Sequence, residues 1–287
     1  RISALRGGKT FYIFESYNPP SAVRHWCNAE ARTFDKNRAI IHTTYKDIPA
    51  EWLGEAILHD IEHTKEVNER AYRNIYLGEA TGTGLNVFEN IELREITDKE
   101  IDTLEYFYYG IDWGYSPDPF MWVEMAYNAR KATLYILDEL RLIKHGNLQA
   151  HEALKEKLMR KFPDAKKYEH ADGHVTYDFM NDRIRADTDA KDIADFFTYG
   201  WNILMAEKGR FRGELGRKVG YKWLQSLDKI VIDPVRTPRA ADEFTLYEYQ
   251  IDKRTGDILS GYPEGQPDHA MAAVRYAMAD VYRYAGE

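Results

Sequence analysis

Two aspartates, Asp112 and Asp187, each follow a short apolar stretch that the sequence predicts to be a strand. Asp112 stands just before the glycine- and proline-rich turn at residues 114–119, and Asp187 closes the run 184–187. An aspartate at the end of an apolar strand is costly to bury alone, so it favours a bound cation or a proton. Two carboxylates at the ends of neighbouring strands suit a divalent-metal site for phosphodiester chemistry. We therefore take both as candidate metal ligands; the alternative is a pair of exposed turn aspartates.

Histidines and a further aspartate lie near these positions or in loops of their own. His269 begins the last predicted helix and could line a metal or a leaving group from a third side. The alternative for this residue is a structural or exposed histidine. His170 and His174 flank Asp172 in a polar loop, which we interpret as solvated because no further ligands accompany them. Asp189 is predicted to cap the helix that follows it.

The densest basic run of the chain lies between residues 208 and 222. It contains the candidate DNA contacts Lys208, Arg210, Arg212, Arg217, Lys218 and Lys222. Its glycines and aromatic residues would let backbone and rings approach a phosphate chain, and the alternative is a solvated helix face. The net charge of −8 argues against a protein coated in positive charge, but it leaves room for a local patch and for an acidic metal site.

The composition is that of an ordinary globular protein. Its 287 residues, 44% of them hydrophobic and 30% charged, are enough for two modest domains. We find no apolar run of bilayer length and no signal-peptide pattern, so we expect no membrane partner. The single cysteine, Cys27, excludes an internal disulfide framework and is interpreted as a plain buried or partly buried thiol in a reducing compartment. Because the chain begins at Arg1, within apparently structured sequence, we expect a fragment of a longer protein.

Residues 1–100 are predicted to form one part of the chain. We expect strands over 11–14 and 39–44, a helical stretch over about 50–76, a glycine-rich loop over 78–84 and an acidic linker over 86–100. The series Gly-Gly-Lys-Thr at residues 7–10 is not a phosphate-binding loop, because Ser3 stands where the earlier glycine is required and a strand follows rather than a helix.

Residues 101–287 are predicted to form an α/β unit. Three successive antiparallel strands are expected over 106–111, 120–127 and 133–137. Beyond them we expect helices over 148–161, 190–199, 214–227 and 268–283, strands over 184–187, 202–205 and 229–233, and a β-hairpin over 244–260. Three antiparallel strands followed by alternating strands and helices is the order of a ribonuclease H-like fold, a mixed sheet flanked by helices.

Taken together, these motifs resemble the large subunit of tailed-phage terminases, in particular the PBSX-like branch, over nearly the whole chain. Gly110-Ile111-Asp112-Trp113-Gly114 is similar to the motif of the family's first nuclease acid, and Ala186-Asp187-Thr188-Asp189 is similar to the second. The series continues in order through Glu243-Phe244 to His269. The resemblance implies a nuclease domain over 101–287, with Asp112, Asp187 and His269 catalytic and the two aspartates binding one or two Mg²⁺ or Mn²⁺ ions.

The first hundred residues resemble the C-terminal portion of the P-loop-type ATPase domain of the same family. Phe14-Glu15-Ser16-Tyr17-Asn18-Pro19-Pro20 is similar to the ATPase coupling segment, in which we take Ser16 and Asn18 as the coupling residues. The resemblance implies that the nucleotide-binding motifs lie mostly upstream. ATP is therefore expected as a cofactor of the full-length protein only.

The last helix departs from the family pattern at one position. The family carries His-x-x-Asp-Ala there, with the aspartate as third metal-binding acid, whereas this chain reads His269-Ala270-Met271-Ala272-Ala273. Alanine offers no ligand, and Asp268, about one helical turn earlier, could replace it only if the metal shifted. Two accounts are open: an engineered replacement that disables the nuclease, or a natural variant.

The resemblance implies the large subunit of a phage DNA-packaging motor, which cuts concatemeric viral DNA with a metal-dependent endonuclease. The expected partners are double-stranded viral DNA, the portal protein, the small terminase subunit and further copies of the chain on the portal. The expected location is the host-cell cytoplasm and, transiently, the procapsid portal vertex. The alternatives are a non-catalytic DNA-binding or motor-docking module and another ribonuclease H-like nuclease of transposase or resolvase type. The coupling-like segment around Asn18 counts against the transposase or resolvase type.

Overall fold

The computed structural model divides the chain into two compact units, Arg1–Gly84 and Leu85–Glu287. The structure describes residues 13–21, 25–32, 36–82, 84–187, 189–206, 213–252, 254–255, 257–259 and 261–282. Asp112, Asp187 and His269 all belong to the second unit. None of the described helices is both long enough and apolar enough to cross a membrane.

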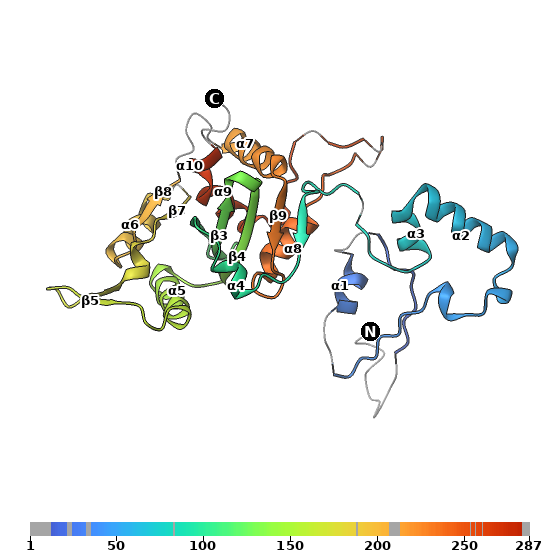
Figure 1. Ribbon diagram of the computed structural model, residues 1–287, viewed down its shortest axis with the longest axis horizontal. Coiled ribbons are helices and arrows are strands. Elements are labelled where there is room, and N and C mark those ends of the chain that lie inside the picture. Colours follow the sequence, from blue (N-terminus) through green and yellow to red (C-terminus); the bar gives the residue numbers. More distant parts are fainter. Residues whose placement is uncertain are drawn as a thin grey trace. The chain divides into compact units, whose positions relative to one another are not determined.

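A seven-stranded mixed sheet forms the centre of the second unit (Figure 1). Its strands are β1 Ile91–Leu93, β2 Phe107–Asp112, β3 Phe120–Asn128, β4 Thr133–Leu142, β7 Ile184–Ala186, β8 Ile203–Met205 and β9 Lys229–Ile232. Across the sheet they run in the order β1-β9-β4-β3-β2-β7-β8. β3 is antiparallel to β2 and β4, whereas all other neighbouring strands are parallel. The three predicted antiparallel strands are confirmed.

Helices cover both faces of this sheet. They are α4 Asp98–Ile101, α5 Asn147–Lys161, α6 Ala190–Thr198, α7 Gly213–Ser226, α8 Pro238–Leu246, α9 His269–Ala277 and α10 Ala279–Tyr282. Along β3, Met121 and Val123 pack in one apolar cluster with residues of α7, α8 and α9, whereas Trp122 packs in a second cluster with α5 and α6. Successive side chains of a strand point to opposite faces, so the continuous apolar run of β3 reflects burial on both sides. The predicted mixed sheet flanked by helices is confirmed.

The predicted hairpin over 244–260 is only partly present. Phe244 belongs to α8, a helix that the sequence analysis missed, and one isolated bridge joins Ile251 to Ile258. Pro238 at the first turn starts this helix, and Ala240, Ala241 and Phe244 bury its inner face at helical spacing. The aromatic residues after Phe244 favour a strand by type. They follow directly on a short helix, so the predicted hairpin was extended over the end of that helix.

The segment predicted as an acidic linker, 86–100, belongs to the second unit. Its residues Ile91–Leu93 form β1, which pairs in parallel with β9 at the edge of the sheet. The second unit therefore begins at Leu85, whereas the sequence placed the boundary near residue 100. A three-residue strand lacks a clear sequence signal of its own, because its partner lies far along the chain.

Two further elements refine the prediction for the second unit. The last helix, predicted over 268–283, is divided into α9 and α10 at Met278. Strands β5 Lys167–Glu169 and β6 Val175–Tyr177 form a separate antiparallel hairpin around the loop with His170 and His174. Two 3-10 turns, η4 Ala129–Lys131 and η5 Asp178–Asn181, complete the unit.

The described part of the first unit is helical and irregular. It contains α1 Trp26–Arg32, η2 Tyr45–Asp47, η3 Ala50–Trp52, α2 Glu55–Val67 and α3 Glu69–Ile75. The strand predicted over 39–44 is wrong: the backbone there is irregular, and Ile41 is 85% exposed. Of the strand predicted over 11–14, residues 13 and 14 are irregular and exposed, and residues 11 and 12 lie outside the described residues. An apolar run becomes a strand only where a neighbour pairs with its backbone.

The helix predicted over 50–76 is broken in two places. η3 and α2 are separated at Gly54, and α2 ends at Asn68, whose side chain accepts a hydrogen bond from the Ala71 amide and so caps α3. Of the apolar residues that suggested one helix, Ile61 is buried, but Trp52 is 74% exposed. Asparagine favours caps over helix interiors, which explains the break.

Helix α9 lies against the backbone of β2 at Gly110. A Cβ atom built on Gly110 would collide with the carbonyl oxygen of Ala273 and would lie 3.1 Å from the Cβ of Ala277. Only glycine lets the helix approach this closely, and the approach is what brings the start of α9 to the end of β2.

We predict that Gly110→Ala lowers the free energy of unfolding by about 3 kcal/mol, because the helix must be pushed off the sheet. Urea unfolding measures this loss. Gly146→Ala is the control, since its Cβ would meet only the flexible end of Gln149. That change should cost less than about 1 kcal/mol. Equal losses in the two variants would contradict the packing argument.

Candidate active site

Asp112 and Asp187 lie at the carboxyl ends of two adjacent parallel strands. Ile111 of β2 stands opposite Ala186 of β7, and the Asp187 amide donates to the Ile111 carbonyl oxygen at 3.3 Å. The carboxyl ends of parallel strands meet at one edge of a sheet, so the two acids emerge there together. The sequence prediction that the two aspartates follow neighbouring strands is confirmed.

Burial of Asp112 makes its negative charge energetically costly at this edge. Its side chain is 13% exposed, and burial raises the pKa of its carboxyl group. The hydrogen bond from His269 lowers that pKa, whereas the charges of Asp187 and Asp268 raise it further. Burial is the largest of these effects, so ionising Asp112 costs more than ionising a free aspartate. A cation bound at this edge would stabilise the ionised carboxylate.

His269 is placed between two carboxylates. It is the first residue of α9; its Nδ1 lies 3.0 Å from Oδ2 of Asp112, and its Nε2 lies 3.6 Å from Oδ1 of Asp118. The hydrogen bond with Asp112 raises the pKa of the imidazole. Asp118, in the turn after β2, was not singled out from the sequence, because nothing in its local pattern shows which side chain it faces.

Ala272 stands one turn after His269 and offers no donor. Its side chain is 8% exposed and lies in a small cluster with Ala206, Tyr276 and Ala279. Among the residues that the structure describes, no group of three or more histidine, cysteine, aspartate or glutamate side chains could hold a metal ion. Asp112 and Asp187 do suit one Mg²⁺ or Mn²⁺ ion, since such ions are commonly held by one or two carboxylates and several waters.

The carboxylate of Asp268 is bound by residues of α7. Its Oδ2 accepts a hydrogen bond from the Tyr221 hydroxyl at 3.0 Å and lies 3.8 Å from the Arg217 guanidinium. Asp268 also makes no side-chain bond to the helix that it precedes. Its carboxylate is therefore tied to α7 rather than to the edge occupied by Asp112.

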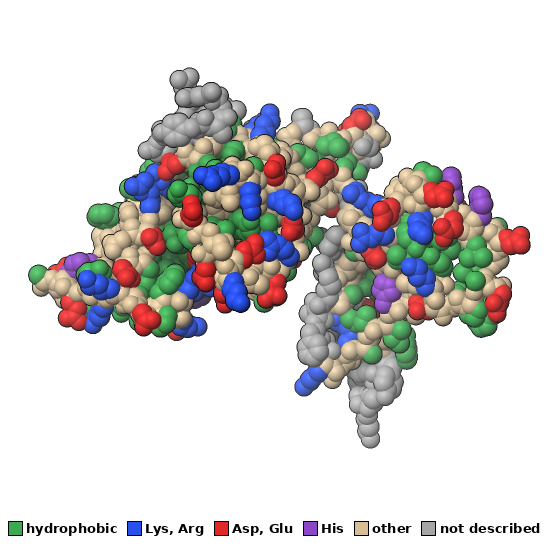
Figure 2. Space-filling model, in the orientation of Figure 1, with side chains coloured by type: hydrophobic (Ala, Val, Ile, Leu, Met, Phe, Trp, Pro, Cys, Tyr) green, Lys and Arg blue, Asp and Glu red, His purple; other side chains and the backbone are tan. Residues whose placement is uncertain are grey.

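The candidate DNA contacts divide into three groups. Lys208, Arg210 and Arg212 lie outside the described residues. Arg217 is held inside the protein: its guanidinium donates to the Tyr247 hydroxyl and the Pro263 carbonyl oxygen and lies over the ring of Tyr221. Lys218 is half-buried, and Lys222 is exposed on α7. On the face drawn in Figure 2, acidic and basic side chains are interspersed over the second unit.

Ser16 and Asn18 belong to the first unit and lie in an irregular, exposed stretch. The end of that stretch is anchored by two side-chain amides: Asn74 donates to the Pro19 carbonyl oxygen at 3.0 Å, and Asn28 donates to that of Pro20 at 2.7 Å. The stretch is thus fixed to α1 and α3, while the role of its residues in coupling stays a prediction.

Three minor sequence predictions are met by the geometry. Asp189 caps α6 by accepting from the amides of Lys191 and Asp192. His170 and His174 are stacked, with ring centroids 4.4 Å apart, in the polar loop of the β5–β6 hairpin. Cys27 is buried, with its sulfur 3.0 Å from Nδ1 of His25.

One buried carboxylate next to the site was missed as a functional residue. Glu243 of α8 is 6% exposed, and its Oε2 accepts a hydrogen bond from the amide of Ala270, directly after His269, at 2.6 Å. Burial raises the pKa of Glu243 to about 7. No local signal could reveal this contact, because the two residues are separated by 27 positions.

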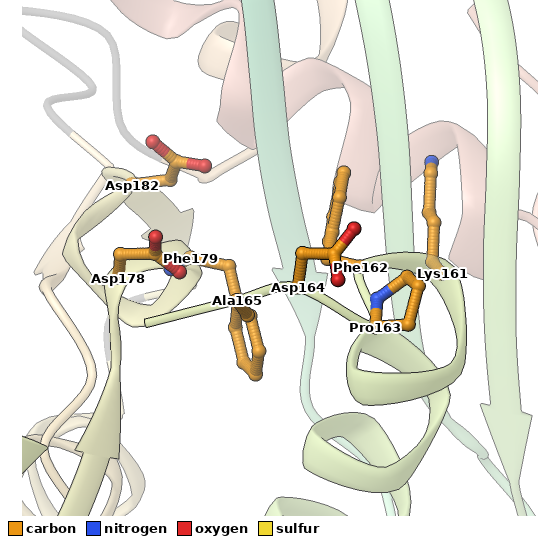
Figure 3. Close-up of a pocket in the computed structure, with 8 residues that line it drawn as sticks. All are labelled: Lys161, Phe162, Pro163, Asp164, Ala165, Asp178, Phe179 and Asp182. Atoms are coloured by element: carbon orange, nitrogen blue, oxygen red, sulfur yellow. The ribbon is translucent and has the colours of Figure 1, made fainter. Parts of the chain in front are cut away.

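A cavity of about 590 Å³ lies away from these residues (Figure 3). It is lined by Lys161, Phe162, Pro163, Asp164, Ala165, Asp178, Phe179 and Asp182. These residues come from the end of α5 and from the segment that leads into β7, whereas Asp187 follows β7. The cavity is therefore at the opposite end of β7 from the acid pair.

Known proteins share both the sequence and the fold. The family described as phage terminase large subunit matches residues 2–79. The terminase large subunit of Bacillus phage SPP1 is 35% identical over 277 residues, which are 95% of this chain and 60% of that protein. The solved nuclease domain of the bacteriophage SPP1 large terminase, with bound Mn, matches at a TM-score of 0.54 and 31% identity. That match covers 67% of this chain and 97% of the domain.

Glu243 makes stability depend on pH in a defined direction. Its folded pKa of about 7 exceeds the ordinary value of 4.5, so the folded state holds this proton more tightly than the unfolded state does. The free energy of unfolding should therefore fall as pH rises from about 4.5 to about 7, by at most about 3 kcal/mol. Glu243→Gln should remove this component. Urea unfolding of both proteins at pH 5 and pH 8 measures it, and identical pH dependences would contradict it.

Proposed function

Because the chain belongs to the family of phage terminase large subunits, we propose that its second unit is a metal-dependent DNA endonuclease that cuts concatemeric viral DNA during genome packaging. One observation carries the proposal: two carboxylates leave adjacent parallel strands at one sheet edge, and a histidine lies 3.0 Å from one of them. The chain spans 60% of the length of its curated relative, so the activity concerns part of a larger protein.

Asp112 and Asp187 would hold the metal ion. The proposal draws support from the solved SPP1 domain, which carries bound Mn. When bound, Mg²⁺ or Mn²⁺ supplies an activated water and stabilises negative charge on the phosphate. The two aspartates would hold that ion at the end of the sheet, where its positive charge would stabilise the ionised form of the buried Asp112.

His269 would act on the phosphate side of the site. Its raised pKa favours the imidazolium, which can donate a hydrogen bond to a phosphate oxygen or a proton to the departing 3′ oxygen. Asp112 holds the ring at Nδ1, whereas the exposed Asp118 carboxylate lies 3.6 Å from Nε2, too far for a hydrogen bond, so Nε2 is the nitrogen that would face the phosphate. Exposed Lys222 of α7 would contact the DNA backbone without reading its sequence.

Ala272 favours a second candidate, a non-catalytic module that binds DNA or docks the motor. A two-metal mechanism needs further carboxylates, and this helix supplies alanine where the family resemblance places an acid. In that case the site would keep its shape but cut slowly or not at all. The transposase or resolvase alternative loses its support, because the family match lies in residues 2–79, which a stand-alone nuclease would not need.

The first unit would be the C-terminal portion of the ATPase domain, with Ser16 and Asn18 in its coupling segment. ATP would act on the full-length protein. The partners would be double-stranded viral DNA, the portal protein, the small terminase subunit and further copies of this subunit on the portal. The protein would work in the host-cell cytoplasm and, transiently, at the procapsid portal vertex.

Plasmid cleavage in Mn²⁺ tests the nuclease. We expect Ala272→Asp to cut at least about tenfold faster than the chain as given, because it adds a carboxylate one turn from His269. Adding Asp112→Asn to that variant should abolish cutting, which serves as the control for a contaminating nuclease. If Ala272→Asp never cuts and Asp112→Asn changes neither Mn²⁺ affinity nor stability, the metal site is refuted.

Variants of Arg217 and Lys222 distinguish an arginine that stabilises the fold from a lysine that contacts DNA. Arg217→Ala should lower the free energy of unfolding by about 2 kcal/mol, because the Tyr247 hydroxyl loses the arginine donor and the Pro263 carbonyl keeps only its bond from Tyr247. Lys222→Ala should leave stability within about 0.5 kcal/mol of the parent. It should nevertheless weaken duplex binding and reduce the salt slope by about 1. Fluorescence anisotropy at several salt concentrations measures binding, and unchanged binding would remove Lys222 from the interface.

A further inference from the structure

Helix α9 begins without a capping bond from its own first residues. The early amides of a helix have no partner within it and need acceptors from elsewhere. Asp268, at the N-cap, makes no side-chain bond to the helix, because its carboxylate is bound by the Tyr221 hydroxyl. The acceptor comes instead from α8: Oε2 of Glu243 lies 2.6 Å from the Ala270 amide and 3.4 Å from that of Met271.

Helix α8 is itself held by a carboxylate from another element. Glu139 of β4 accepts from the Arg239 amide through Oε1 and from the Ala240 amide through Oε2, both at 2.9 Å. The N-cap residue of α8, Thr237, makes no side-chain bond to the helix. Two carboxylates therefore connect three elements: Glu139 of β4 caps α8, and Glu243 of α8 caps α9.

These contacts end at the active site. His269 is the residue before Ala270, so the bond that fixes the Ala270 amide also fixes the backbone that carries the imidazole. The imidazole must keep its 3.0 Å contact with Asp112, and catalytic geometry is sensitive to displacements well below 1 Å. A residue that holds the first turn of α9 thus controls the position of His269.

We propose that Glu243 is a positioning residue of the active site, which holds the start of α9 so that His269 faces Asp112, with Glu139 holding α8 in turn. The proposal rests on the nuclease function proposed above. Glu243 touches neither the two aspartates nor the DNA in this scheme. It acts only through the backbone of the first turn of α9.

Two variants and a matched control test it in the whole chain carrying Ala272→Asp. Glu243→Ala removes the acceptor, whereas Glu243→Gln keeps a side-chain oxygen that can still accept. The control is Glu124→Gln, which removes an equally buried carboxylate on β3 that pairs with Lys161 of α5 on the opposite face of the sheet. All three variants are expected to lose stability, so stability alone does not distinguish them.

The expected result is a specific pattern. Glu243→Ala should speed hydrogen exchange at the Ala270 and Met271 amides about tenfold. It should lower kcat for plasmid cleavage at least about tenfold while KM for DNA and Mn²⁺ affinity stay within about twofold. Glu243→Gln should recover most of kcat. Glu124→Gln should change neither the two amides nor kcat.

Two outcomes would overturn the proposal. The first is faster exchange at both amides with an unchanged kcat, which would leave Glu243 as a helix cap without influence on His269. The second is a pair of additive shifts in Tm, a readout that needs no cleavage and so separates failure of the positioning from failure of the nuclease if the Ala272→Asp parent does not cut DNA. The thermal stabilities of Glu243→Ala, His269→Ala and the double variant then decide: coupled residues give non-additive shifts in Tm, and additive shifts refute the positioning.

Discussion

The parallel pairing of β2 with β7 is the interaction on which the candidate site depends. It places Asp112 beside Asp187 at one sheet edge, although the two residues are 75 positions apart in the chain, and the Asp187 amide completes the pairing through its bond to Ile111. The cost of this arrangement is electrostatic. Two carboxylates are brought together where one of them is largely buried, so the site requires positive charge and His269 supplies part of it.

The position of His269 depends in turn on a close backbone contact. α9 can approach β2 only because residue 110 is glycine, and the helix is then held at its start by Glu243 and along its length by the core of α7 and α8. The helix thus places the imidazole of His269 and the side chain of Ala272 at the same edge. The positions of His269, of Ala272 and of the Glu243 contact all follow from how this one helix packs on the sheet.

Sequence patterns were reliable where a short local signal sufficed. The apolar runs that end at Asp112 and Asp187, and the Asp189 cap of α6, were all correctly predicted, because strand alternation and capping are properties of adjacent residues. The apolar run around Ile41 was misread, since no neighbouring strand pairs with it in the described structure. Arg217 looked like a DNA contact in its basic run, yet its partners Tyr247 and Pro263 come from 30 and 46 positions away. Asp118 and Glu243 could not be found either, because only folding brings them to His269.

Alanine at position 272 limits the negative charge at this edge of the sheet. With alanine there, the acids whose charges act on Asp112 are Asp187 and Asp268, with Asp118 at the rim of the edge, and the Asp268 carboxylate is bound by the Tyr221 hydroxyl with Arg217 at 3.8 Å. The contact of His269 with Asp112 offsets part of the repulsion between these acids, but burial still keeps the pKa of Asp112 raised. An aspartate at position 272 would add a third carboxylate to an edge where one histidine contacts Asp112. Its charge could be met only by a divalent ion or by a proton, which would make the metal part of the stability of the site as well as of its chemistry.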